Sequence, residues 1–225
     1  MTLLPGLLEC RAVTADRVRL QIDRVSKTYG SRRVLRPVSA ELRCSDTLLV
    51  TGHNGVGKST LLRIISGLLR QSEGAVQYWQ DGVALDAATR RRAFGFVGPD
   101  LRLYRELTAR EHLEFVGRLR GLPRHSVHIE TALEMVGLGG RADLAVSAFS
   151  SGMVQRLRYA LALMPAPRVL VLDEPTTNLD DEGVKMVGRI VEMVARDGIV
   201  VIATNDPRDQ RYGELVLALD QPADG

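Results

Sequence analysis

The chain has 225 residues, of which 45% are hydrophobic and 25% are charged, and its formal net charge is +3. This length and composition fit one globular domain, alone or with a small subdomain, and exclude a largely disordered chain. No apolar run approaches the roughly 18–20 residues of a membrane-spanning helix, residues 1–6 lack the pattern of a secretory signal, and two cysteines are too few for a disulfide scaffold or a metal cluster.

The first half of the chain shows the pattern of strands followed by one helix. Residues 1–17 precede the first clear pattern, and we expect a tail or an extra strand there. Apolar and polar residues alternate over residues 18–22 and again over residues 38–42, which predicts strands with one exposed face. Residues 48–50 are apolar on both faces, as in a buried parallel strand, and residues 61–69 then show helical spacing.

The second half repeats this order after a helical insertion. The strand pattern disappears over about residues 101–148, where residues 107–121 and 128–136 show helical spacing. The remaining elements are a strand, a helix and two more strands, predicted at residues 169–172, 184–194, 199–203 and 214–219. We therefore predict an α/β domain over residues 18–225, with a mostly parallel central sheet and an inserted helical subdomain.

A phosphate-binding loop lies between the buried strand at residues 48–50 and the helix that follows it. The sequence there matches G-x-x-x-x-G-K-[ST]. Its glycines let successive N–H groups turn toward phosphate oxygens, and the helix N-terminus adds the positive end of its dipole. Lys58 can reach the β- and γ-phosphates, and the Ser59 hydroxyl can bind Mg²⁺. The residues predicted to hold the nucleotide are Gly52, His53, Asn54, Gly55, Val56, Gly57, Lys58, Ser59 and Thr60.

A pair of carboxylates ends the second apolar strand. Asp173 and Glu174 follow residues 169–172 directly. A carboxylate at the carboxyl end of a strand beside a phosphate loop can hold Mg²⁺, commonly through water. A second carboxylate can orient and polarise an attacking water. Together with the phosphate loop, these residues predict a site for a nucleotide and Mg²⁺, with Asp173 as a metal ligand and Glu174 as a catalytic base.

Further motifs make the chain resemble the nucleotide-binding domain of the ATP-binding cassette (ABC) family over about residues 18–219. Residues 149–153, Phe-Ser-Ser-Gly-Met, resemble the family signature L-S-G-G-Q, and residues 178–180, Asn-Leu-Asp, resemble its D-loop. Ser150 is a good helix N-cap that leaves the next N–H groups open to an anion. The further nucleotide contacts that the resemblance implies are Tyr29, Ser150, Ser151, Gly152, Met153 and Asp180.

The resemblance implies a fold, a cycle and partners. The fold is that of P-loop NTPases, with an antiparallel β edge beside the parallel sheet. In the family, two cassettes close head-to-tail over two ATP molecules, each signature contacting the nucleotide bound to the other subunit. ATP binding and hydrolysis then drive separate membrane-spanning permease subunits, which places the chain in the cytoplasm, peripheral on the inner face of the cell membrane. Its short length resembles export-type cassettes, including the haem-exporter ATPase of cytochrome c maturation.

Two departures from the family pattern concern catalysis. The Q-loop glutamine is missing, and the spacing puts Pro99 in its place, while a shift of one residue would let Asp100 serve as a metal ligand instead. Asn205 stands where the family's switch histidine is expected; its amide can donate to a phosphate but cannot carry a proton. We expect Asn205 to act in catalysis, and hydrolysis to be slow or to depend on a partner subunit.

The sequence also bears on functions other than a transporter ATPase. A soluble cassette for assembly, for example of iron–sulfur clusters, and a binding-only cassette that completes a heterodimer both remain open. Nucleic-acid binding is not expected, because the one dense basic run, residues 90–92, has no aromatic residues among it. The histidines, among them His112, show no metal-ligand pattern and are expected on the polar surface.

Overall fold

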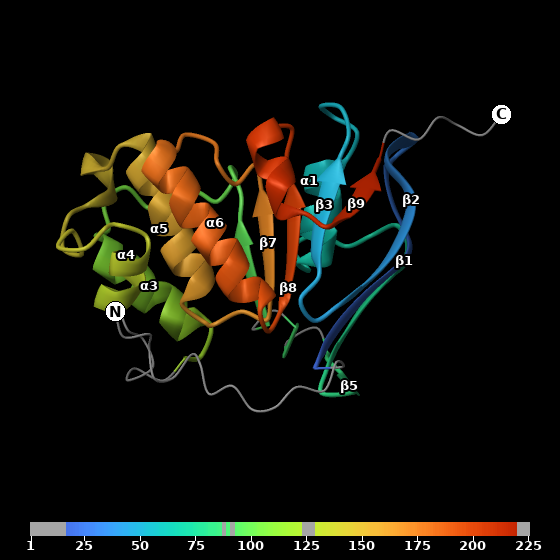
Figure 1. Ribbon diagram of the computed structural model, residues 1–225, viewed down its shortest axis with the longest axis horizontal. Coiled ribbons are helices and arrows are strands. Elements are labelled where there is room, and N and C mark those ends of the chain that lie inside the picture. Colours follow the sequence, from blue (N-terminus) through green and yellow to red (C-terminus); the bar gives the residue numbers. More distant parts are fainter. Residues whose placement is uncertain (1–16, 87–88, 91–92, 123–128, 220–225) are drawn as a thin grey trace.

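The computed structural model describes residues 17–86, 89–90, 93–122 and 129–219, arranged as two sheets with helices (Figure 1). The predicted tail or extra strand at residues 1–17 lies, except for residue 17, outside the described residues. In the order of the chain, the parallel strands alternate with helices, as predicted for an α/β domain. None of the helices in the described ranges is long and apolar enough to cross a membrane.

The smaller sheet is antiparallel and has the strand order β2-β1-β4-β5. Its strands are β1 (Val18–Tyr29), β2 (Arg32–Arg43), β4 (Glu73–Gln80) and β5 (Val83–Ala84). The alternation expected in the sequence is present, because Val18, Leu20 and Ile22 are buried while the residues between them are partly exposed. This sheet is the antiparallel edge that the family resemblance implied.

The larger sheet is parallel and has the strand order β6-β7-β8-β3-β9. Its strands are β3 (Thr47–Thr51), β6 (Phe94–Val97), β7 (Val169–Asp173), β8 (Ile199–Ala203) and β9 (Leu215–Ala218). Strand β8 pairs with β7 on one side and with β3 on the other. The loops that follow these three strands therefore emerge side by side at one edge of the sheet.

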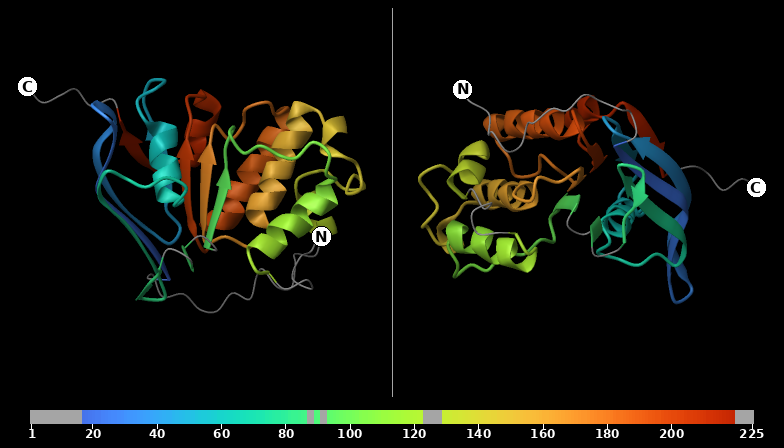
Figure 2. Two further views of the ribbon diagram at one scale, coloured as in Figure 1. Left: turned by 180° about the vertical axis from the view of Figure 1, so that it is seen from behind. Right: turned by 90° about the horizontal axis from the view of Figure 1, so that it is seen from below.

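Helices cover both faces of the parallel sheet and define two cores. Figures 1 and 2 show α1 (Lys58–Ile65) between the two sheets, and α5 (Ser151–Leu163) and α6 (Asp181–Ala195) on the other face. Alternate residues of one strand enter different cores: Leu170 and Leu172 pack toward α5 and α6, whereas Val169 and Val171 pack toward α1. This explains why the central strands are apolar on both faces.

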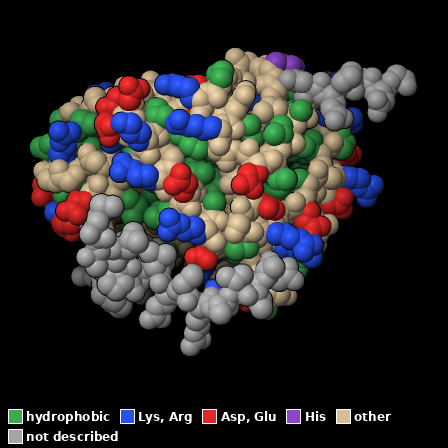
Figure 3. All heavy atoms as spheres, viewed as in Figure 1, with side chains coloured by type: hydrophobic (Ala, Val, Ile, Leu, Met, Phe, Trp, Pro, Cys, Tyr) green, Lys and Arg blue, Asp and Glu red, His purple; other side chains and the backbone are tan. Residues whose placement is uncertain are grey.

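The inserted helices α3 (Ala109–Leu119) and α4 (Ile129–Met135) both pack against α5. A capping box between Thr108 and Glu111 begins α3. After α4 the chain returns through a 3₁₀ turn, η2 (Val146–Ala148), to the start of α5. On the face shown in Figure 3, basic and acidic side chains lie interspersed, with apolar side chains between them.

Several predicted details are wrong. Helix α1 ends at Ile65, because Gly67 adopts a left-handed conformation (φ 73°), so Leu68 is 61% exposed. Strands β4 and β6 were not predicted. His112 is not on the surface: it is buried in α3, where its ring nitrogens contact the Thr108 carbonyl at 2.9 Å and the Tyr104 N–H at 3.0 Å. It fixes a turn, which explains a buried histidine without a metal.

Candidate active site

The phosphate loop is folded by glycines in conformations that other residues rarely adopt. Gly55 and Gly57 have φ of 84° and 113°. At Gly57 a Cβ atom would lie 2.7 Å from the carbonyl oxygen of Val34, so a side chain cannot be accommodated there. Helix α1 begins directly afterwards at Lys58, with Gly57 as an N-cap that has no side chain to occupy the first N–H groups. These donors point where an anion can bind.

Lys58 is buried to 7% exposure and its amine is held by three oxygen atoms. Nζ donates to the carbonyl oxygens of Gly52 at 2.6 Å and His53 at 3.2 Å, and to Oδ1 of Asn205 at 3.0 Å. Two carbonyl groups of the loop and the Asn205 side chain thus supply the acceptors that phosphate oxygens would replace. The charge remains inside the loop, where the motif requires it.

Ser59 and Asp173 form a pair suited to Mg²⁺. The Ser59 side chain is hydrogen-bonded to Asp173, and the other carboxylate oxygen, Oδ2, is buried without a hydrogen-bond partner among the described residues. Burial raises the pKa of Asp173, and the hydrogen bond from Ser59 partly opposes that shift. An unpartnered carboxylate oxygen beside a hydroxyl fits a hard cation whose other ligands are water and phosphate. The described residues contain no group of three or more His, Cys, Asp or Glu side chains that could hold a metal without such help.

Glu174 occupies a constrained position at the end of β7. Its backbone is left-handed (φ 51°), and its N–H donates to the carbonyl oxygen of Ala203 at 2.8 Å, which ties it to the end of β8. Burial raises the pKa of its carboxyl group, and the negative charge of Asp173 acts in the same direction. A raised pKa makes the ionised carboxylate a stronger base toward water.

Asn205 joins the phosphate loop to the carboxylate. Its amide oxygen accepts from Lys58, and its Nδ2 donates to Oδ1 of Asn54 at 2.5 Å and contacts Oε1 of Glu174 at 3.4 Å. The side chain therefore uses both its acceptor and its donors within the site. The structure brings these predicted residues together although they are far apart in sequence.

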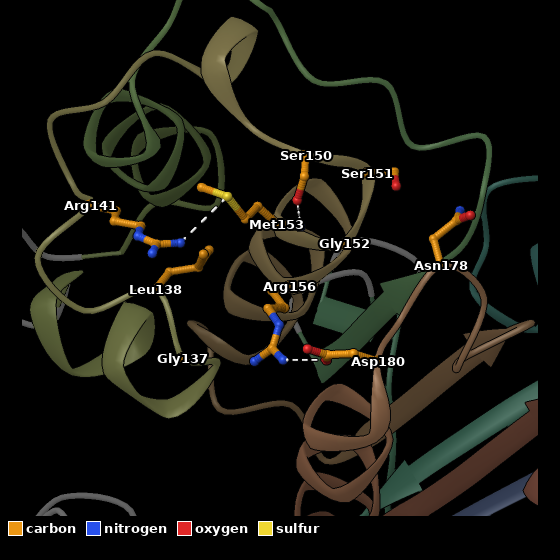
Figure 4. A pocket seen from close by; sticks show the side chains of 10 residues that line it. All are labelled: Gly137, Leu138, Arg141, Ser150, Ser151, Gly152, Met153, Arg156, Asn178 and Asp180. Atoms are coloured by element: carbon orange, nitrogen blue, oxygen red, sulfur yellow. Dashed lines mark hydrogen bonds and ion pairs between the residues drawn. The ribbon is translucent and has the colours of Figure 1, made fainter.

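The signature residues form a separate pocket of about 480 Å³ (Figure 4). Ser150 caps α5, its Oγ accepting from the N–H of Met153 at 3.2 Å. Two arginines line the pocket: Arg156 donates to Oδ1 of Asp180 at 2.8 Å, and Arg141 donates to the sulfur of Met153 at 3.5 Å. The lining residues are Gly137, Leu138, Arg141, Ser150, Ser151, Gly152, Met153, Arg156, Asn178 and Asp180, none of which belongs to the phosphate loop.

The remaining predicted site residues make no hydrogen bond or ion pair to Lys58, Asp173, Glu174 or Asn205 among those found in the described residues. Asp100 forms an ion pair with Arg63 of α1, and the carbonyl oxygen of Pro99 accepts from Arg158 Nη2 at 3.1 Å. Tyr29 ends β1 with 53% exposure, and the Lys27 amine lies 4.8 Å from the centre of its ring. Asp100 would have to leave Arg63 before it could bind a metal, whereas the exposed Tyr29 ring is free for stacking on one face.

Sequence reasoning missed a buried carboxylate behind the site. Asp209 lies in the 3₁₀ segment η3 (Pro207–Tyr212), and it accepts hydrogen bonds from Thr176 and Thr204. The surrounding sequence at residues 207–211, Pro-Arg-Asp-Gln-Arg, has the composition of an exposed turn. No local pattern distinguishes Asp209 from a surface residue, because its burial depends on the loops after β7 and β8.

Comparisons with known proteins agree with this geometry. The family model described as "ABC transporter" matches residues 35–177. The linearmycin resistance ATP-binding protein LnrL of Bacillus subtilis is 32% identical over 83% of this chain and 60% of its own length. The cytochrome c biogenesis ATP-binding export protein CcmA of Haemophilus influenzae is 29% identical over 83% of this chain and 88% of its own. The Nod factor export ATP-binding protein I of Sinorhizobium fredii is 34% identical, and the match spans 56% of that protein.

Solved structures of the same kind share the fold. The structure of an ATP-binding subunit of an ABC transporter superposes with a TM-score of 0.77 at 27% identity, covering 88% of this chain and 85% of that one. A dimeric post-hydrolysis state of an ATP-binding cassette bound to ADP and Pi gives a TM-score of 0.77 at 26% identity, covering 88% and 93%. The chain spans about 60% of LnrL and 56% of the Nod factor export protein, so each of these relatives contains additional sequence.

Proposed function

The chain belongs to the ABC transporter family, and from this premise we propose that it binds ATP with Mg²⁺, hydrolyses it, and powers transport through separate membrane-spanning subunits. One observation carries the proposal: the ends of β3, β7 and β8 bring Lys58, Glu174 and Asn205 into one connected site. Asn205 contacts both of the others, at 3.0 Å to the Lys58 amine and 3.4 Å to the Glu174 carboxylate.

In this proposal each residue has a distinct chemical task. Lys58 and the N–H groups of the phosphate loop bind the β- and γ-phosphates and neutralise charge on them. Glu174 accepts a hydrogen bond from a water and takes its proton as the water oxygen bonds to the γ-phosphorus, while the bond to the ADP oxygen breaks. Asn205 donates to the transferring phosphoryl group. Mg²⁺ held through Ser59 and Asp173 would neutralise charge on the phosphate oxygens.

We further propose that two copies, or this chain and a related cassette, act head-to-tail. The signature pocket and the phosphate loop are separate on one chain, which leaves the signature free to contact a nucleotide bound by another chain. The N–H groups at the start of α5, beside Ser151 and Gly152, are the donors that would meet its γ-phosphate. The dimeric state of the related cassette is consistent with such an assembly.

The proposed place of the chain is at the inner face of a membrane, as a peripheral subunit of a transporter. Relatives named for export and resistance favour export as the direction. We propose residues 18–225 as the ATP-binding unit, with the helical part at about residues 101–148 facing the permease. The substrate would be bound by the permease.

A binding-only cassette is the second candidate, because Asn205 and Pro99 replace two side chains that catalyse hydrolysis in the family. Turnover by the purified chain separates the two functions. We expect ATP hydrolysis that Lys58→Ala abolishes, with nucleotide affinity reduced about 10- to 100-fold, since a charge-assisted hydrogen bond contributes roughly 1.5–3 kcal/mol. A folded Lys58→Ala variant that hydrolyses ATP at the parental rate would refute the assignment of the site.

A further inference from the structure

Asp209 is a buried carboxylate to which the proposed reaction gives no task. None of its surface is exposed (0%). Its Oδ2 accepts hydroxyl hydrogens from Thr204 at 2.7 Å and from Thr176 at 3.2 Å, whereas its Oδ1 is buried without a hydrogen-bond partner among the described residues. Burying a carboxylate that is only partly satisfied costs free energy, so its presence calls for an explanation beyond packing.

The two threonines belong to the two loops that carry the catalytic side chains. Thr176 follows Glu174 by two residues at the end of β7, and Thr204 directly precedes Asn205 at the end of β8. Asp209 therefore connects both loops through a single oxygen atom. The Glu174 loop has a second anchor, since the Tyr159 hydroxyl donates to the carbonyl oxygen of Pro175 at 3.0 Å.

The Thr204 hydroxyl has two acceptors but only one hydrogen. Its Oγ1 lies 2.7 Å from Oδ2 of Asp209 and 3.4 Å from Oε2 of Glu174, and it accepts from the N–H of Asp206 at 2.9 Å. The short contact takes the hydrogen, because 3.4 Å is long for an O–H···O bond. The hydroxyl hydrogen is thus turned away from Glu174.

We propose that Asp209 is a positioning residue that keeps the Glu174 carboxylate free for water. It does so by holding the one hydroxyl hydrogen that would otherwise occupy Oε2. Without Asp209, the Thr204 hydroxyl turns and donates to Glu174, and the attacking water has to displace that hydrogen bond. This role rests on the proposed ATP hydrolysis. In it Asp209 acts through Thr204 and contacts neither the nucleotide nor the attacking water.

A rescue experiment on the full chain tests the role. Asp209→Ala should lower kcat for ATP by about ten-fold or more, the effect of one hydrogen bond to a charged group, and leave KM within about two-fold. Adding Thr204→Val to Asp209→Ala removes the competing hydroxyl and should recover most of the lost kcat. Thr176→Val is the matched control: it deletes the other hydrogen bond to Oδ2, and kcat per folded molecule should stay at the parental value.

The outcomes separate this role from a structural one and from failure of the proposed function. The role is overturned if the double variant has a kcat no higher than that of Asp209→Ala while circular dichroism shows equal folded fractions. It is also overturned if Thr176→Val loses as much kcat as Asp209→Ala. If Asp209→Ala does not fold, Asp209→Leu fills the space and the same pair is compared. If the parent chain is no faster than Lys58→Ala, the proposed hydrolysis itself is refuted, and this role with it.

Discussion

Removing the Asn205 side chain should lower turnover without weakening nucleotide binding. Asn205→Ala deletes the donor shared between Asn54 and Glu174, and it deletes one of the three oxygen atoms that hold Lys58. The loss of a donor aimed at a developing oxyanion costs about 2.7–4 kcal/mol in hydrolases where it has been measured. A neutral amide whose N–H₂ group already has partners in the two neighbouring loops, Asn54 and Glu174, should contribute less. We expect at least about 1.4 kcal/mol, which is a ten-fold loss of kcat.

Nucleotide affinity should respond in the opposite direction. In the structure the Lys58 amine is bound to Asn205 Oδ1, so this contact has to be exchanged before Lys58 reaches a phosphate. Asn205→Ala removes the competitor, and the Kd for ATP should stay equal or fall. A coupled ATPase assay and a fluorescent nucleotide titration on one preparation give both values. Unchanged kcat with a lowered melting temperature would show that Asn205 only stabilises the turn after β8.

Three further results are expected. Asn205→His should leave turnover equal or higher and add a pH dependence between about 6 and 7.5, near the ordinary imidazole pKa, which a pH–rate profile measures. Glu174→Gln should keep ATP binding but lose hydrolysis, so size-exclusion chromatography with Mg-ATP should show a dimer; a nucleotide-bound monomer, also in the presence of permease, would contradict the head-to-tail arrangement. Because burial raises the pKa of Asp173 in the folded state, the contribution of Asp173 to the free energy of unfolding should decline as pH rises through that pKa. Melting curves of the nucleotide-free parent chain and of Asp173→Asn over one pH series should therefore show the parent losing stability relative to the variant as pH rises.

The sequence predicted the parts of the site that depend on local patterns. The phosphate loop is contiguous in sequence. Its glycines are required by the backbone path and its lysine by the charge of the phosphates, so the motif can be recognised without a structure. The apolar strands before Asp173 and Asn205 could also be predicted, because strands that are buried on both faces lack polar residues. Strand β6 was not predicted, since Gly95 interrupts the apolar run of its four residues, Phe-Gly-Phe-Val, and glycine is unfavourable within a strand.

Other features depend on contacts that no local pattern encodes. His112 is satisfied in its buried position by two backbone groups, one in the turn before α3 and one at the N-cap of α3. Asp209 is satisfied by two threonines in the loops after β7 and β8. Asp100 was a candidate metal ligand by spacing alone, whereas its ion pair with Arg63 depends on how the loop after β6 meets α1. Predicting a side chain that is placed by tertiary contacts requires the order of the strands in the sheet, which no local sequence pattern gives.

The strand order also determines how the catalytic groups are coupled. Strand β8 lies between β3 and β7, so the loop after β8 contacts the phosphate loop on one side and the Glu174 loop on the other. Asn205 spans both sides through Lys58 and Glu174. Under the proposed function, a phosphate that draws Lys58 away would release the amide oxygen of Asn205. Phosphate binding would thereby change the partners of the residue that also contacts the proposed base, Glu174. A residue after β3 or after β7 would have only one of the other two loops as a direct neighbour. The residue that contacts both therefore has to follow β8, the strand between them.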